Sequence, residues 1–124
     1  QIDHAALAVA TALEMQRQVE MRKDEWEFYH MPELRVSIGI STGDAVVGYV
    51  GSGERMQYTA IGAHVNLASR LEELAKDLDV KIAISPATYA LVEDVADCAE
   101  LGVFELHNVP APVKVYEVRG YRAG

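Results

Sequence analysis

Cysteine, basic side chains and long apolar runs are scarce in this chain, and each shortage excludes a class of protein. Cys98 is the only cysteine among 124 residues, so no internal disulfide is possible and a reducing, cytoplasmic location is the simplest expectation. The 11 lysines and arginines are outnumbered by 19 acidic residues; the resulting net charge of −8 argues against a nucleic-acid partner, which needs a basic face. No apolar run approaches the ~20 residues that a membrane-spanning helix needs, so we expect no direct membrane contact from this segment.

Several ligand-binding signatures are also missing. The loop at residues 51–55 has no Gly-Lys-Ser/Thr ending, so it is not a P-loop, and it lacks the third glycine of a dinucleotide fingerprint. His4 and His30 have no cysteine or second histidine at the spacing of zinc ligands. There is no signal peptide, and the chain begins at Gln1 rather than Met, which suggests a fragment or a processed product. A membrane anchor elsewhere in a parent protein stays compatible with the sequence.

The rest of the chain is organised around residues 37–73. Six of the nine glycines fall between Gly39 and Gly62, where the backbone has to turn or pass close to another group. Alternating apolar and polar residues predict a strand over 35–42 and a second strand over 45–50, joined by a turn. A glycine-bearing loop is expected to follow this hairpin.

A helix is predicted after Gly62, because the hydrophobic period changes there. Asn66 and Arg70 lie four residues apart, so they share one face of this helix. The leucines beside them recur at helical spacing: Leu67, Leu71, Leu74 and Leu78. His64, in the first turn, is interpreted as an exposed polar residue. For an arbitrary sequence, a hairpin followed by an amphipathic helix would be a sufficient description.

The flanking segments complete one α+β domain over residues 1–124, a sheet covered by helices. A first helix is expected from about His4 to Glu27, with Phe28 among the aromatic residues that cover the edge of the core. The later elements are expected to be a strand over 80–84, a short helix with Ser85 as N-cap and Pro86 at its first position, and an antiparallel pair of strands over 98–106 and 113–119.

Several separated sequence words resemble the catalytic domain of the class III nucleotidyl cyclases, the adenylate and guanylate cyclases. The words are Ile38-Gly39-Ile40-Ser41-Thr42-Gly43, Val47-Gly48-Tyr49-Val50-Gly51, Tyr58-Thr59-Ala60-Ile61-Gly62 and Val65-Asn66-Leu67-Ala68-Ser69-Arg70-Leu71-Glu72. They stand in the family's order and spacing, and the likeness continues through 84–89 and 112–118. The resemblance implies a ferredoxin-like cyclase domain with an antiparallel-rich sheet, truncated at its N-terminus because the family's first strands precede this chain.

The resemblance implies an adenylate cyclase, a lyase that converts ATP into 3′,5′-cyclic AMP and pyrophosphate in signalling. The family's ribose-orienting Asn and phosphate-binding Arg match Asn66 and Arg70. From the residues alone, Arg70 could instead form an ion pair with Glu73 on the helix surface. The base-recognition position falls on Thr59, whose hydroxyl can accept a hydrogen bond from the adenine amino group and so favours ATP. The alternative for Thr59 is a structural loop residue.

Three departures from the family pattern concern the triphosphate and the metal. His107 stands where the family has a lysine, and a neutral histidine is a weaker phosphate partner. An arginine that some members place before the first strand of the hairpin falls near Ser37, and Arg35 is the candidate to replace it. The family's two metal-binding aspartates belong to an upstream segment, so ligands for Mg²⁺ or Mn²⁺ in the intact domain are expected outside this chain.

The family's dimeric sites suggest what this chain supplies. One subunit contributes the metal carboxylates and the other contributes the Asn, the Arg and base recognition, so we expect a homodimer or a complementary cyclase subunit and no activity from this chain alone. The alternatives are a guanylate cyclase, a degenerate cyclase-like module that binds nucleotide or dimerises for regulation, which His107 favours, and a structural α+β interaction domain.

Overall fold

The computed structural model describes residues 4–28, 35–42, 44–51, 55–61 and 66–122, without the side chains of residues 26, 27, 49–51 and 55–61. The elements are α1 His4–Met21, α2 Lys23–Phe28, β1 Arg35–Ser41, β2 Asp44–Gly51, β3 Arg55–Ile61, α3 Asn66–Leu78, β4 Ile82–Ile84, α4 Pro86–Val92, β5 Ala96–Phe104 and β6 Val113–Tyr121. This mixture of helices and strands confirms the predicted α+β class.

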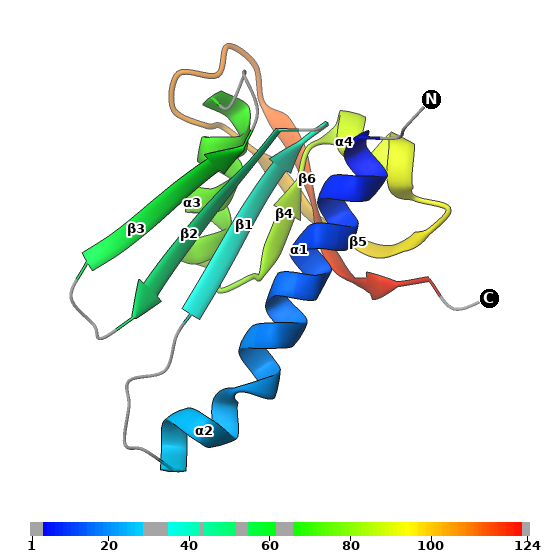
Figure 1. Cartoon of the computed structure of the whole chain (residues 1–124). Coiled ribbons are helices and arrows are strands. Elements are labelled where there is room, and N and C mark those ends of the chain that lie inside the picture. Colours follow the sequence, from blue (N-terminus) through cyan, green and yellow to red (C-terminus); the bar gives the residue numbers. More distant parts are fainter. Residues whose placement is uncertain (1–3, 29–34, 43, 52–54, 62–65, 123–124) are drawn as a thin grey trace.

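The strands form one sheet in the order β3-β2-β1-β4-β6-β5. Only the β1–β4 pairing among these neighbours is parallel, so the sheet is rich in antiparallel pairs, as predicted. Helices α1 and α4 lie on one face of the sheet and α3 lies on the other, which gives three layers (Figure 1). Each helix can therefore bury one apolar side against the sheet.

The larger hydrophobic core lies between the sheet and the helices α1 and α4. Small residues on α1 (Ala5 and Ala12, with Val9 between them) let the helix approach the strands closely. The strands contribute β-branched residues that suit a pleated surface. The buried members of this core are Ala5, Val9, Ala12, Ile38, Ile40, Ala45, Val47, Ile82, Ile84, Val92, Ala96 and Val118.

A smaller core on the other face holds α3 in place. Leu71 and Ala75 of α3 pack with Ala83 of β4 and Val115 of β6. The helix backbone lies directly against β1, because a Cβ at Gly39 would be 2.9 Å from the carbonyl carbon of Leu71 and would also overlap other backbone atoms of the helix. Glycine at this position therefore sets the separation between helix and sheet.

The N-terminal helix differs from the prediction of one continuous helix to Glu27. Helix α1 ends at Met21, and α2 begins at Lys23 after a turn at Arg22, whose amide bonds to the Val19 carbonyl three residues back. Phe28 does not cover the core edge, since 76% of its surface is exposed. The prediction for Phe28 was wrong because α2 leaves the sheet, as Figure 1 shows.

Residues 55–61 form a strand where a loop was expected. The flanking glycines suggested a loop, but β3 pairs along its whole length with β2, from Gly51↔Arg55 to Ala45↔Ile61. The period-two alternation of polar and apolar residues in this segment was the overlooked signal. Its position at the edge of the sheet explains why it contains few strongly hydrophobic residues.

The predicted hairpin is confirmed, with one residue reassigned. Thr42 was expected in the first strand, but it lies in the turn with φ of 55°, and its amide donates to Thr88 Oγ1 at 2.5 Å. Residues 41 and 44 form the last pair before the turn, so β1 ends one residue earlier than expected. The side chain of Thr88 thus ties this turn to α4.

The C-terminal half follows the prediction closely. Ser85 is the N-cap of α4 and Pro86 opens the helix, with the Ser85 hydroxyl accepting from the Thr88 amide. Strands β5 and β6 pair antiparallel, although β5 spans Ala96–Phe104 rather than 98–106 and carries two register shifts. On α3, the expected leucine stripe is incomplete, because Leu78 is exposed near the helix end.

Candidate functional site

The first half of α3 carries the two predicted catalytic residues. Asn66 is the first residue of the helix and is exposed, and Arg70 follows one turn later with 28% of its side chain exposed. The buried side of the helix is formed by other residues, namely Ala68, Leu71, Glu72 and Ala75. Asn66 and Arg70 therefore share a solvent-accessible face, as the spacing predicted.

Arg70 forms the ion pair that was the alternative to a catalytic role. Its Nη1 donates to both carboxylate oxygens of Glu73 at 3.0 Å, and 46% of the Glu73 side chain is exposed. An i,i+3 pair at this exposure contributes only about 0.3–0.5 kcal/mol. Within the described part of the chain, the hydrogen bonds of Arg70 use Nη1 alone, so the other guanidinium donors can meet an incoming phosphate.

Thr59 lies in β3, and its backbone is placed by the sheet register. It pairs with Val47 of β2, which pairs in turn with Ile38 of β1. Strand β3 ends at Ile61, and the next described residue, Asn66, begins α3. The Thr59 side chain and the whole of His64 lie outside the described part of the structure, so the base-reading role of Thr59 stays a prediction.

His107 follows Leu106, which packs in the same hydrophobic cluster as Leu67 of α3. Leu106 and Leu67, which adjoin His107 and Asn66, pack against the same buried cluster. Figure 1 shows the connection between β5 and β6 at the same end of the sheet as the start of α3. His107 is exposed in a turn that is closed by the bond from the Val109 amide to the Leu106 carbonyl, at 3.1 Å.

Arg35 lies away from this group, at the opposite end of β1. Its row in the sheet contains Val50 and Met56, three residues from the row that contains Thr59. Three residues of a strand span about 10 Å. Arg35 is exposed, whereas Ser37 on the same strand face is buried beneath α3. The structure thus places Asn66 and Arg70 one turn apart on α3, with the β5–β6 connection that carries His107 at the same end of the sheet (Figure 1), and leaves Arg35 at the opposite end of β1.

The candidate residues fit a nucleotide rather than a metal ion. Mg²⁺ prefers carboxylate and water oxygens, and this set offers an amide, two guanidinium groups, a hydroxyl and an imidazole. In the ranges that the structure describes, no group of three or more His, Cys, Asp and Glu side chains could hold a metal. These described residues therefore offer no ligand set for the metal that the sequence resemblance implies.

The structure reveals one buried polar residue beside the site that the sequence patterns did not identify. Glu72 on α3 is 0% exposed, and its Oε2 accepts a hydrogen bond from the Ser37 hydroxyl at 2.5 Å. Burial raises the pKa of Glu72, while the bond from Ser37 and the charge of Lys76 act in the opposite direction. The signal available in the sequence was a glutamate on the same helix face as Ala68 and Ala75.

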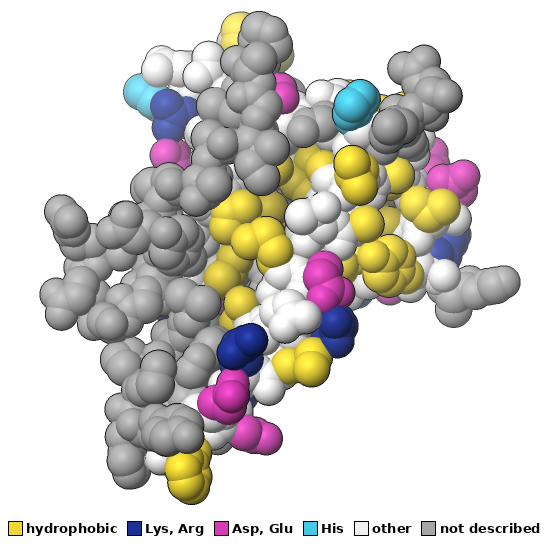
Figure 2. Space-filling model, viewed as in Figure 1, with side chains coloured by type: hydrophobic (Ala, Val, Ile, Leu, Met, Phe, Trp, Pro, Cys, Tyr) yellow, Lys and Arg dark blue, Asp and Glu magenta, His cyan; other side chains and the backbone are white. Residues whose placement is uncertain are grey.

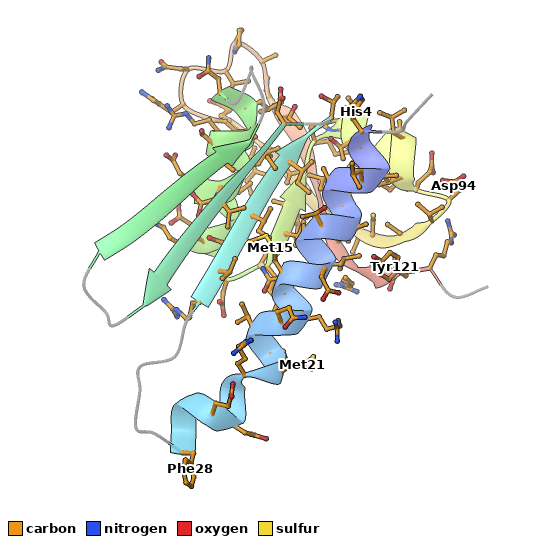
Figure 3. The ribbon with its side chains drawn as sticks, viewed as in Figure 1. His4, Met15, Met21, Phe28, Asp94 and Tyr121 are labelled. Carbon is orange, nitrogen blue, oxygen red and sulfur yellow. The ribbon has the colours of Figure 1, made fainter. Side chains whose placement is uncertain are left out.

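An apolar groove lies on the face of the sheet opposite α3. A groove of about 590 Å³ runs between α1 and the strands β1 and β2, and its lining is mostly apolar. Figure 2 shows hydrophobic side chains gathered along this face. Met15 points from α1 toward the sheet, whereas Met21 and Phe28 point away from it (Figure 3). The groove contains none of the predicted site residues.

Cys98 has the properties of a structural thiol. It is half-buried on β5, and burial, followed by the charge of Asp97, raises the pKa of its thiol. A raised pKa lowers the thiolate fraction and hence the reactivity. Its partial burial and raised pKa therefore fit a packing residue rather than a nucleophile. The helices within the described ranges also include none long and apolar enough to cross a membrane.

Comparisons with known proteins agree on one family. Residues 1–120 match the family model for the adenylate and guanylate cyclase catalytic domain. Adenylate cyclase 1 of Rhizobium meliloti (strain 1021) is 38% identical over 117 residues, which are 94% of this chain and 18% of that protein. Two crystal structures are also similar: the adenylyl cyclase CyaB from P. aeruginosa, at 32% identity and a TM-score of 0.71, and the guanylyl cyclase Cya2, at 30% identity and a TM-score of 0.65.

The matched proteins are longer than the present chain. The alignment with CyaB covers 98% of this chain and 63% of the other, and the alignment with Cya2 covers 98% and 61%. The chain therefore spans less than two thirds of each of these structures and a smaller share of the rhizobial relative.

Proposed function

This chain belongs to the adenylate and guanylate cyclase catalytic domain family, and we propose that it supplies the base-recognition and transition-state residues of an adenylate cyclase. The observation that carries the proposal is the placement of Asn66 and Arg70, one turn apart on the accessible face of α3. His107 lies in the β5–β6 connection, at the end of the sheet where α3 starts (Figure 1). The proposed substrate is ATP, and the products are 3′,5′-cyclic AMP and pyrophosphate.

The proposed reaction makes one bond to phosphorus and breaks another. The ribose 3′-oxygen bonds to the α-phosphorus, its proton leaves to solvent, and the bond from that phosphorus to the bridging oxygen of the β-phosphate breaks. Asn66 would orient the ribose by hydrogen bonding, which lowers the entropy that has to be lost in the transition state. Arg70 would meet the charge that develops on the phosphoryl oxygens, as a planar and permanently charged group can.

The ion pair between Arg70 and Glu73 supports this role. The pair with Glu73 uses one guanidinium nitrogen, Nη1, and favours a guanidinium position on the accessible face of α3. Since the pair is partly exposed, a phosphoryl group whose negative charge grows in the transition state can compete for the guanidinium at little energetic cost. His107 would add a hydrogen bond to the triphosphate in place of the lysine that the family resemblance implies.

The metal ions and the second half of the site would come from elsewhere. We propose that Mg²⁺ or Mn²⁺ is held by carboxylates outside these residues, in a homodimer or with a complementary cyclase subunit. The chain spans about 63% of a related catalytic domain, and its own candidate residues suit the nucleotide. The apolar groove beside α1 is a surface that an additional polypeptide could cover. On this proposal the chain is inactive by itself.

A guanylate cyclase is the second candidate, because a guanylyl cyclase is nearly as similar in identity and fold as an adenylyl cyclase. The decisive experiment measures cyclic nucleotide production from ATP and from GTP, with Mg²⁺ or Mn²⁺. It uses the 124-residue chain and, beside it, the longest native polypeptide that contains it. Activity of the longer form alone, with ATP preferred, supports the proposal. A folded, dimeric and silent longer form points to a degenerate regulatory module.

Substituting Arg70 tests the proposed mechanism. Arg70→Ala in the active polypeptide is expected to lower kcat on the order of 10²–10³-fold with a smaller change in KM, because one preformed charge stabiliser is lost. Arg17→Ala is a matched control, since Arg17 forms an i,i+3 pair with Glu14 on the exposed face of α1. An unchanged kcat in Arg70→Ala would remove Arg70 from the mechanism.

A further inference from the structure

Glu72 links the helix that carries Asn66 and Arg70 to two strands of the sheet. Its side chain is 0% exposed, and the Ser37 hydroxyl on β1 donates to its Oε2 at 2.5 Å. The carboxyl group also lies over the backbone of Gly48 on β2, because a Cβ on that residue would overlap the carboxyl oxygen. One side chain of α3 thus contacts both strands of the central hairpin.

The sheet register connects this contact to the strand that bears Thr59. Ser37 and Gly48 face each other in the β1–β2 pairing, and Gly48 pairs with Tyr58 of β3. Thr59 is the next residue along β3. Asn66 lies six residues before Glu72 on α3, which is about 9 Å along the helix axis. Glu72 therefore lies on the helix that carries Asn66 and contacts the row of the sheet next to Thr59.

The carboxyl group at this point is suited to an uncharged state. Among the described residues, Glu72 Oε1 has no hydrogen-bond partner, and an ionised carboxylate buried without a cationic partner is strongly disfavoured. On α3, the surrounding charged groups are Lys76, Glu73 and Asp77. From β1 and β2, the described neighbours are the uncharged Ser37 and Gly48. Burial raises the pKa of Glu72, which agrees with this geometry.

The two adjacent glutamates of α3 thus have different tasks. Glu73 is partly exposed and pairs with Arg70, whereas Glu72 is buried two residues from the same arginine. A charged Glu72 would bury an ionised carboxylate whose Oε1 has no hydrogen-bond partner among the described residues. An apolar residue would fill the volume but would leave the buried hydroxyl of Ser37 without this acceptor. A neutral glutamic acid avoids both penalties.

We propose that Glu72, as an uncharged buried acid, is a positioning residue that seats α3 on β1 and β2 and sets the placement of Asn66 and Arg70 relative to the Thr59 strand. The inference rests on the proposed function for its catalytic consequence, and on the packing of α3 alone for its structural part.

The test compares two substitutions of the same carboxyl group. Glu72→Gln keeps the length, the lack of charge and an acceptor for Ser37, so kcat is expected to stay within about threefold of the wild type. Glu72→Asp withdraws the group by one methylene, and a misplacement of about 1 Å near a catalytic constellation costs on the order of 10²-fold in kcat. KM is expected to change less than kcat, because substrate contacts remain. Glu20→Gln, an exposed glutamate on α1, is the matched control.

Loss of stability alone has to be separated from loss of position. Ser85→Ala removes the cap of α4, which packs on the face of the sheet opposite α3, and serves as a variant with lowered stability but an unaltered α3. At a temperature well below the unfolding transition of every variant, Ser85→Ala is expected to keep its kcat while Glu72→Asp does not. Equal losses of kcat in the two variants would overturn the positioning role, as would a wild-type kcat in Glu72→Asp.

A readout without catalysis keeps the inference separate from the proposed function. Amide hydrogen exchange of α3 in the 124-residue chain is expected to accelerate in Glu72→Asp and to remain at the wild-type rate in Glu72→Gln. The carbonyl infrared band of a protonated carboxylic acid is expected to persist in the wild type above the pH at which an ordinary glutamate ionises, and to be lost in Glu72→Gln. If every native polypeptide is inactive but these signals appear, the proposed function fails and the seating of α3 stands. Unchanged exchange in Glu72→Asp, or no such infrared band, overturns the inference whatever the activity.

Discussion

Replacing Gly39 by alanine should displace α3 more than any other single methyl group added at the described glycines. The new Cβ would lie 2.9 Å from the carbonyl carbon of Leu71 and would overlap the Ala68 carbonyl oxygen and the Glu72 amide nitrogen. Carbon atoms normally pack at about 3.5–4.0 Å. All three obstacles belong to helix backbone, so no side-chain rotation can relieve the overlap, and the helix has to retreat from β1.

The size of the effect follows from the packing that this retreat disturbs. Overpacking a well-filled core costs about 1–3 kcal/mol. Alanine also restricts the unfolded chain more than glycine does, which offsets about 0.4–1 kcal/mol. Because the obstacles are helix backbone atoms, we take the upper end of the overpacking range, which leaves a net loss of about 2 kcal/mol and a fall in Tm of roughly 8 °C for a chain of this length. Thermal unfolding followed by circular dichroism measures this fall directly.

The chain offers two comparisons for the same substitution. A Cβ at Gly120 on β6 meets no atom within 4 Å, so Gly120→Ala should stay within about 0.5 kcal/mol of the wild type. A Cβ at Gly48 meets the end of the Glu72 side chain rather than backbone atoms, so Gly48→Ala should fall between the other two variants. Equal Tm values for Gly39→Ala and Gly120→Ala would refute the close seating of α3 on β1.

Three further predictions follow from other sites. Ser85→Ala should lower the free energy of unfolding by about 1 kcal/mol, because the hydrogen bond that caps α4 at the Thr88 amide is lost. Chemical denaturation measures this free energy, and a change below about 0.3 kcal/mol would contradict the capping role. The raised pKa of Glu72 means that the native state holds this proton more tightly than the unfolded chain. The resulting stability is complete below the ordinary glutamate value of about 4.3 and is lost as the pH rises through the native pKa. Unfolding measured from pH 4 upward should therefore show a steeper decline in the wild type than in Glu72→Gln, and identical slopes would speak against it. Thr59→Ala in an active polypeptide should reduce the preference for ATP over GTP, measured as the ratio of kcat/KM values; an unchanged ratio would exclude Thr59 from base recognition.

Much of the fold was predictable because hydrophobic periodicity and local turn chemistry determine it. The alternation in 35–42 predicted β1, and the sequence Ser85-Pro86 predicted the start of α4. Strand β3 was missed because the glycines on either side of it favoured a loop over its period-two alternation, and the pairing with β2 decides its conformation. The break at Arg22 was missed because the residues around it are mostly charged, so no apolar periodicity marks where the first helix ends.

The candidate site was predictable where a local spacing carries it. Asn66 and Arg70 need only one helical turn to share a face, and the structure places them so. The position of His107 near α3 depends on the packing of Leu106 and Leu67 in a common cluster, which no local pattern contains. The burial of Glu72 depends on two glycines in other strands, and only the tertiary structure brings the three residues together.

The parallel pairing of β1 with β4 has a consequence for how the chain folds. Strands β1, β2 and β3 form one antiparallel meander, and β5 and β6 form another, so each half can assemble from neighbouring segments. The short β4 joins the halves through residues 82–84, which pair with 38–40 on one side, and through two pairs with β6 on the other. Because loop closure must precede this contact, the junction is expected to form late in folding. In partial unfolding, we expect the sheet to separate first at β4, which would leave two cooperative units.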